Sequence, residues 1–139
     1  MNSRYFSLVC LLFAIGLGGC SPASQEDYYR EGRRLTQVLI DQLQSVQSHE
    51  QLLAIESDLK NAFDSLVALM IQSREFQDQQ GEGAFEEASE ESALLKEALL
   101  RVYAIEGGRE LIEKTEQEAL IRLDAYERQR MKKRDLIHK

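Results

Sequence analysis

Apolar residues recur every three or four positions over most of this 139-residue chain. This period is typical of amphipathic helices, which pack one apolar side against their neighbours. The first such stretch is expected from Glu26 to about Gln47, because Glu26 and Asp27 suit the positive end of a helix dipole. Its predicted inner face consists of Leu35, Val38, Leu39, Leu43 and Val46.

The segment after Ser48 has the clearest pattern in the chain. Ser48, followed three residues later by Gln51, matches a capping box and predicts a sharp turn between two antiparallel helices. The second helix then carries two series of residues seven apart: Leu52, Leu59, Leu66 and Ser73, and Ile55, Ala62, Leu69 and Phe76. Phe63 and Met70 widen this stripe beyond a coiled-coil seam, which favours a globular bundle over a two-stranded zipper.

Glycines mark the boundaries in the rest of the chain. The polar run 78–83 contains Gly81 and Gly83 and predicts a loop. A third helix is expected from about Phe85, with an inner face of Ala88, Ser92, Leu95, Ala98, Leu99, Val102 and Ile105. The pair Gly107-Gly108 then predicts either a turn or a kink, and a turn is favoured because each glycine costs about 1 kcal/mol inside a helix.

The last helix is expected from Arg109 to about Ile137. Its predicted inner face consists of Ile112, Thr115, Ala119, Leu123 and Tyr126. The apolar pattern fades after Tyr126, so the segment 128–134 is predicted to be a solvated extension. Together these stretches predict an all-α fold, a small antiparallel bundle of four helices, or of three if the glycine pair is only a kink.

The composition agrees with helices and limits the partners. The only proline is Pro22, so no proline interrupts residues 26–139, a length that suits one domain. The net charge of −7 gives no overall footprint for nucleic acid, and no nucleic-acid partner is expected.

Residues 1–20 have the parts of an export signal. Arg4 lies in a short polar start, residues 6–17 are largely apolar, and Gly18 and Gly19 lead into Cys20. The apolar run is shorter than the roughly 20 residues that a membrane-spanning helix needs. The sequence Leu17-Gly18-Gly19-Cys20 resembles the lipobox of bacterial lipoproteins.

This resemblance implies a membrane anchor. The thiol of Cys20 would receive a diacylglyceryl group, cleavage would fall between Gly19 and Cys20, and the new amine would be acylated. The chain would then divide into a signal peptide (1–19), a lipidated cysteine with a short tether (20–25) and a helical domain (26–139). Two or three acyl chains hold a protein on a membrane, whereas one binds only marginally.

The resemblance also implies a location in the cell envelope. Ser21 follows the cysteine where an aspartate resembles an inner-membrane retention signal, which favours the outer membrane, facing the periplasm, in a Gram-negative host. Tyr28 and Tyr29 come just after the tether. They are expected to pack at the end of the bundle, with contact to the membrane interface as the alternative.

The helical domain has little chemistry of its own. Cys10 belongs to the predicted signal and Cys20 to the anchor, so the domain has no thiol for a disulfide or for zinc. The acidic run 86–91 could bind a divalent cation, but no Glu-x-x-His occurs, and acidic residues are common in a first helical turn. His49 and His138 lack catalytic partners, and the loop at Gly81 is neither a phosphate nor a calcium loop. No catalytic residue, metal or cofactor is predicted.

A basic segment closes the chain. From position 122 onward there are three acidic residues and seven basic ones: Arg122, Arg128, Arg130, Lys132, Lys133, Arg134 and Lys139. Cations at this end complement the helix dipole. The alternative is contact with anionic lipid head groups or with an acidic partner.

The leading functional hypothesis is a non-enzymatic interaction module, held on the membrane through Cys20, that presents helix faces to another envelope protein. The second is a structural spacer that self-associates through the stripe of the second helix. A small metal-binding or hydrolytic protein ranks last.

Overall fold

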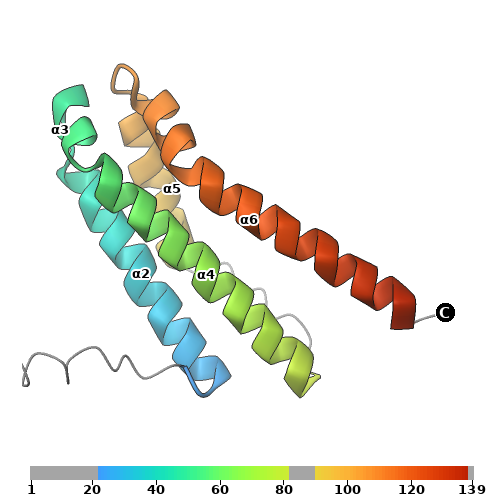
Figure 1. Cartoon of the computed structure of the whole chain (residues 1–139). Coiled ribbons are helices and arrows are strands. Elements are labelled where there is room, and N and C mark those ends of the chain that lie inside the picture. Colours follow the sequence, from blue (N-terminus) through green and yellow to red (C-terminus); the bar gives the residue numbers. More distant parts are fainter. Residues whose placement is uncertain (1–21, 82–89, 138–139) are drawn as a thin grey trace, which may run out of the picture.

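The computed structural model describes residues 22–81 and 90–137 of the chain, and within these ranges every regular element is a helix (Figure 1). The helices are α2 (Gln25–Ser45), α3 (His49–Ala54), α4 (Glu56–Gln80), α5 (Glu90–Tyr103) and α6 (Gly108–Ile137). The predicted all-α fold class is therefore confirmed. The predicted start of the third helix at Phe85, and Ala88 on its inner face, lie outside the described residues.

The start of α2 is fixed by local hydrogen bonds. Ser24 Oγ accepts a hydrogen bond from the backbone N–H of Asp27 at 3.2 Å, and a carboxylate oxygen of Asp27 accepts one from the N–H of Ala23 at 3.1 Å. The first bond satisfies one of the amides left without a partner at a helix start, and the second ties the residue before the cap to the first turn.

The inner face of α2 is rotated from the one that the sequence pattern predicted. Leu39, Leu43 and Val46 are buried as expected, but Val38 is exposed and Ile40 is buried. The reason is that α2 packs against two helices, α4 and α5. The buried face of α2 is therefore set by its position between these two neighbours and not by a single partner.

The capping box after α2 is present in altered form. Ser48 Oγ accepts a hydrogen bond from the N–H of Gln51 at 3.3 Å, as predicted. The Gln51 side chain returns to the N–H of Gln47 at 2.8 Å, one residue earlier than in the standard motif. The single helix predicted from here is divided, because Ile55 (φ −104°, ψ 9°) leaves helical geometry and separates α3 from α4.

Aromatic and ionic contacts define how the long helices pair. Tyr28, in the first turn of α2, contacts Phe76, in the last turns of α4, with ring centroids 5.5 Å apart. Helices α2 and α4 are therefore antiparallel. Helices α4 and α6 run in the same direction, because Lys114 near the start of α6 is hydrogen-bonded to Glu56 at the start of α4. Further along both helices, Arg130 of α6 is hydrogen-bonded to Asp78 of α4. The predicted antiparallel arrangement therefore does not describe the α4–α6 pair.

The buried core lies towards the α3 end of the molecule. It draws on all five helices and on the residue that follows α2, and its members are Leu39, Leu43, Val46, Leu52, Leu59, Ala98, Val102, Leu111 and Ile112. Burying each leucine or isoleucine contributes about 1.5–3 kcal/mol. Helices α5 and α6 touch over only a few residues, so most of α6 packs on α4 alone (Figure 1).

The pair Gly107-Gly108 forms a turn and not a kink. Gly107 has a φ of 71°, and α6 begins at Gly108. A Cβ atom on Gly108 would lie 2.0 Å from the carbonyl oxygen of Val102, so only glycine fits there without movement of the backbone. The His49 ring covers Gly107 from the other side. No helix among residues 22–81 and 90–137 has the length and apolarity needed to cross a membrane.

Candidate interaction surface on α6

Helix α6 is held on α4 by a series of ion pairs. In its first half, Lys114 Nζ lies 2.6 Å from a Glu56 oxygen, and Glu118 lies 2.7 Å from Lys60 Nζ. Arg122 continues the series by donating a hydrogen bond to the backbone oxygen of Asp64 at 2.7 Å. The Lys114 and Arg122 contacts join residues 58 positions apart, so the two helices keep one register here.

The register changes in the second half of α6. Arg130 forms two parallel hydrogen bonds to Asp78, at 2.6 and 2.8 Å, and these residues are only 52 positions apart. Glu127, one turn earlier, pairs with Arg74 of α4. The inner face of α6 runs along the helix as far as Tyr126. Lys114 and Glu118 lie on one edge of this face, whereas Glu127 lies on the opposite edge. Helix α6 therefore crosses α4 rather than lying along a single edge of it.

The Asp78–Arg130 pair is the best formed of these contacts. Only 24% of the Arg130 side chain is exposed, and the bidentate geometry is the strong form of an arginine–carboxylate contact. The hydrogen bond from Arg130 holds the pKa of Asp78 below its ordinary value and raises the pKa of Arg130. Burial, with the negative charges of Glu75 and Asp78, raises the pKa of the neighbouring Tyr126 hydroxyl.

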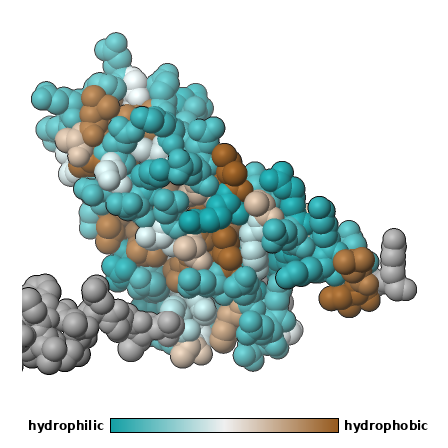
Figure 2. Space-filling model, viewed as in Figure 1, coloured by the Kyte–Doolittle hydropathy of each residue, from teal (hydrophilic) through white to brown (hydrophobic). Residues whose placement is uncertain are grey.

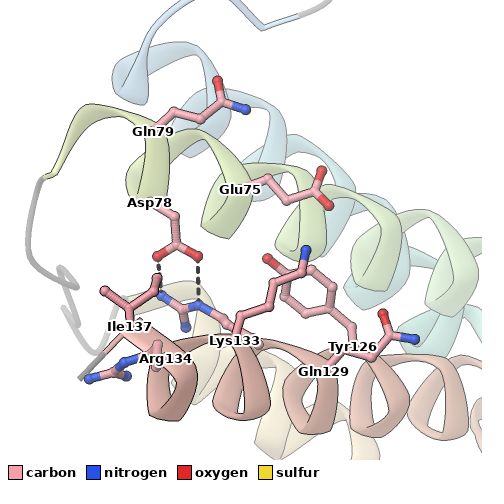
Figure 3. A pocket seen from close by; sticks show the side chains of 9 residues that line it. Glu75, Asp78, Gln79, Tyr126, Gln129, Lys133, Arg134 and Ile137 are labelled. Atoms are coloured by element: carbon pink, nitrogen blue, oxygen red, sulfur yellow. Dashed lines mark hydrogen bonds and ion pairs between the residues drawn. The ribbon is translucent and has the colours of Figure 1, made fainter. Parts of the chain in front are cut away.

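A groove of about 680 Å³ opens between the ends of α4 and α6, next to this pair (Figure 3). Dashed lines in Figure 3 mark the two hydrogen bonds that Asp78 accepts from α6, and Lys133 and Tyr126 lie further along the same cleft. Its lining residues are Glu75, Asp78, Gln79, Tyr126, Gln129, Arg130, Lys133, Arg134 and Ile137. No nucleophile stands beside a base in this lining, so its chemistry is that of a binding surface with both signs of charge.

The side of α6 that faces away from α4 is the second feature. Leu120 is 45% exposed and Ile121 is 58% exposed, and both line a shallow depression of about 490 Å³. The polar rim of the depression is formed by Glu113, Lys114, Gln117 and Asp124. These residues recur at helical spacing, so apolar and charged side chains share one outward face. An apolar centre with a polar rim is typical of a protein-binding patch.

The residues singled out in the sequence are not brought together into one site. Leu17, Gly18, Gly19 and Cys20 lie outside the described residues, as does His138. His49 packs against Gly107, at the opposite end of the core from the groove. In the acidic run 86–91, Glu90 is exposed and Glu91 pairs with Arg33 at 3.6 Å, while residues 86–89 lie outside the described part. No group of three His, Cys, Asp or Glu that could hold a metal occurs in the parts of the chain described.

The basic segment 128–134 differs from the prediction at one residue. Its other residues are exposed, as a solvated extension requires, but Arg130 is largely covered and bonded to Asp78. Helix α6 continues to Ile137. The signal for this contact was present, because Arg130 lies four residues after Tyr126 and thus on the same side of the helix. The partner, Asp78, is 52 residues away in sequence, and no local pattern identifies it.

Comparison of the chain with protein-family models, with curated proteins and with solved structures finds no match.

Proposed function

We propose that this protein is a cell-envelope lipoprotein whose helical domain is a non-enzymatic interaction module, held on the membrane by a lipid on Cys20. The anchor is supported by the resemblance of Leu17-Gly18-Gly19-Cys20 to a lipobox. Ser21 favours the outer membrane, facing the periplasm, in a Gram-negative host.

The outward face of α6 is the observation that carries the interaction role. This 30-residue helix packs on the molecule mainly through α4, which leaves its other side in solvent. Leu120 and Ile121 stand exposed at the centre of that side. Exposed apolar residues surrounded by charges suit a helical partner that lies along α6 and covers them.

The packing of α4 favours this role over that of a spacer assembled through the second predicted helix. Leu59, at the centre of the predicted stripe, is fully buried, and Ala62, Phe63 and Leu66 pack against the same core. An assembly through this stripe would have to open the bundle first.

The interaction module is tested with two variants of equal surface exposure. Ile121 on α6 and Leu100 on α5 are each 58% exposed. Ile121→Glu is expected to abolish a specific cross-link to an envelope protein in intact cells, whereas Leu100→Glu leaves it in place. Mass spectrometry of the cross-linked band identifies the partner. Equal cross-linking by the two variants would contradict a role for the α6 face.

The anchor is tested by palmitate labelling of the wild type beside Cys20→Ala. We expect the wild type to be labelled, cleaved before Cys20 and recovered with membranes, and the variant to lose label and cleavage. A mature amino terminus at another residue, or one without acyl groups, would refute the lipoprotein proposal.

A further inference from the structure

The beginning of α2 and the end of α6 lie at the same end of the molecule. Tyr28, three residues after the start of α2, contacts Phe76 of α4. Asp78, two residues beyond Phe76, is bonded to Arg130 of α6. The chain of contacts from α2 through α4 to α6 therefore brings residues 131–137 to the end at which α2 begins (Figure 1).

This is also the end of the domain that follows Cys20 in the sequence. A fully extended chain spans at most about 3.6 Å per residue, so Cys20 lies within about 14 Å of Ser24, the N-cap of α2. Helix α6 continues for seven residues past Arg130 to Ile137, about 10 Å at 1.5 Å per residue. A lipid on Cys20 would thus hold the end of α6 close to the membrane surface.

The end of α6 carries unpaired positive charge. Arg128, Lys132, Lys133 and Arg134 form no ion pair within the described residues, although the charge of Arg134 helps to lower the pKa of Asp78. Asp135 is the only acidic residue from 128 to 137. Nearby, Asp27 pairs with Arg30, so its charge is compensated locally. Glu75, which lines the groove with Lys133 and Arg134, and Asp135 are carboxylates without an ion pair among the described residues, and the four basic side chains outnumber these two.

Apolar side chains accompany these cations. Met131, Leu136 and Ile137 are all highly exposed, Ile137 the most at 79%. Figure 2 shows hydrophobic residues gathered at the far end of α6. Lysines and arginines beside exposed apolar residues are typical of segments that lie at a lipid–water interface.

We propose that residues 128–137 of α6 are a second membrane contact, in which the four unpaired cations bind anionic phospholipid head groups and the apolar residues enter the interface. This inference rests on the proposed lipid anchor, which brings this end to the membrane. The contact would fix how the bundle stands on the surface and so which way the outward face of α6 points.

The distribution of the charges favours a lipid surface over an acidic protein. Lys133 and Arg134 line the groove between α4 and α6, whereas Arg128 and Lys132 lie on the other sides of the helix. A partner helix packed along one face would meet only some of these cations. Mobile head groups can surround the helix end and neutralise all of them.

The absence of tryptophan from the chain allows a direct test. Full-length protein carrying Leu136→Trp, purified after processing in a bacterial host, is reconstituted in vesicles of phosphatidylcholine with or without phosphatidylglycerol. We expect the tryptophan emission to shift to the blue only in the anionic vesicles, and the shift to disappear at high salt, because salt screens the attraction.

Charge variants in the Leu136→Trp background identify the groups responsible. Reversal of two of the basic residues with Lys132→Glu and Lys133→Glu is expected to remove the shift. The matched control reverses two exposed cations on α5, Lys96→Glu and Arg101→Glu, and is expected to keep it. Far-ultraviolet circular dichroism checks that both proteins keep their helices.

The outcomes separate this inference from the anchor. Equal emission in the two kinds of vesicle, or a shift that the basic reversal does not change, would overturn head-group binding even if mass spectrometry finds acyl groups on Cys20. If the acyl groups are absent, the same protein is mixed with anionic vesicles. A salt-sensitive shift then supports head-group binding while the anchor fails, and no shift refutes both.

Discussion

Single residues at the Gly107-Gly108 turn decide how α5 and α6 are joined. Gly107 adopts a left-handed φ, and Gly108 lies directly against the backbone of Val102. The two glycines are needed for different reasons, one for backbone conformation and the other for space. The spacing of apolar residues in the sequence shows that the helix is interrupted at these glycines, but it does not distinguish the two requirements.

Alanine substitutions at two glycines should change stability in opposite directions. Gly108→Ala places a Cβ atom 2.0 Å from the Val102 carbonyl oxygen, so we expect a loss of about 1–3 kcal/mol in the free energy of unfolding. Gly32→Ala, inside α2, places its Cβ at an ordinary 3.7 Å from Leu69 and should gain about 0.5–1 kcal/mol. Urea unfolding followed by circular dichroism measures both, and a loss in Gly32→Ala would contradict the packing described here.

At the scale of elements, helix boundaries followed from local residues more closely than helix pairing did. Ser48 caps α3 as its sequence predicts, and Gly81 ends α4 with a left-handed φ of 69°. The break at Ile55 had no such signal, since neither glycine nor proline occurs there. The α4–α6 ion pairs join residues more than fifty positions apart, and the sequence offers many equivalent combinations of acid and base.

The Asp78–Arg130 contact between α4 and α6 predicts a pH dependence of stability. Its hydrogen bonds lower the pKa of folded Asp78 below the ordinary 3.8, so the stabilisation is complete above that value and is lost as the pH falls through the folded pKa. Arg130→Gln should therefore reduce the free energy of unfolding by about 0.2–1 kcal/mol at neutral pH, a typical value for a partly exposed pair.

Unfolding of wild type and Arg130→Gln across the acidic range measures this dependence. The difference between them should shrink below the ordinary pKa of the carboxyl group, 3.8. Arg128→Gln, which removes an exposed cation without an ion pair among the described residues, is the matched control and should stay close to wild type. A difference that does not change with pH would show that Arg130 stabilises the protein by packing and not by its charge.

At the scale of the whole molecule, the predicted stripe on α4 is internal around Leu59 but not at Met70. Leu59 is completely buried, whereas Met70 on the same helix is 41% exposed. Leu59→Ala should lower the free energy of unfolding by about 2–5 kcal/mol, because it leaves a cavity in the core. Met70→Ala should cost much less, since water already reaches that side chain.

Urea unfolding combined with sedimentation distinguishes core from interface. We expect Leu59→Ala to be less stable and to keep the sedimentation coefficient of the wild type under native conditions. A fall in mass without a loss of stability would instead indicate that the α4 stripe joins copies of the chain, as in the spacer hypothesis.

The sequence by itself determined the all-α class, the approximate limits of α2 and α6, and the turn at Gly107-Gly108, because helical period, capping residues and glycine conformation act over a few neighbouring residues. Only the tertiary structure decided that α4 and α6 run in the same direction and that Leu120 and Ile121 are exposed. It also decided that Arg130 is bonded to Asp78, while its basic neighbours form no ion pair with the residues that the structure describes. These features depend on which helices meet, and that choice is made by packing between residues far apart in the chain.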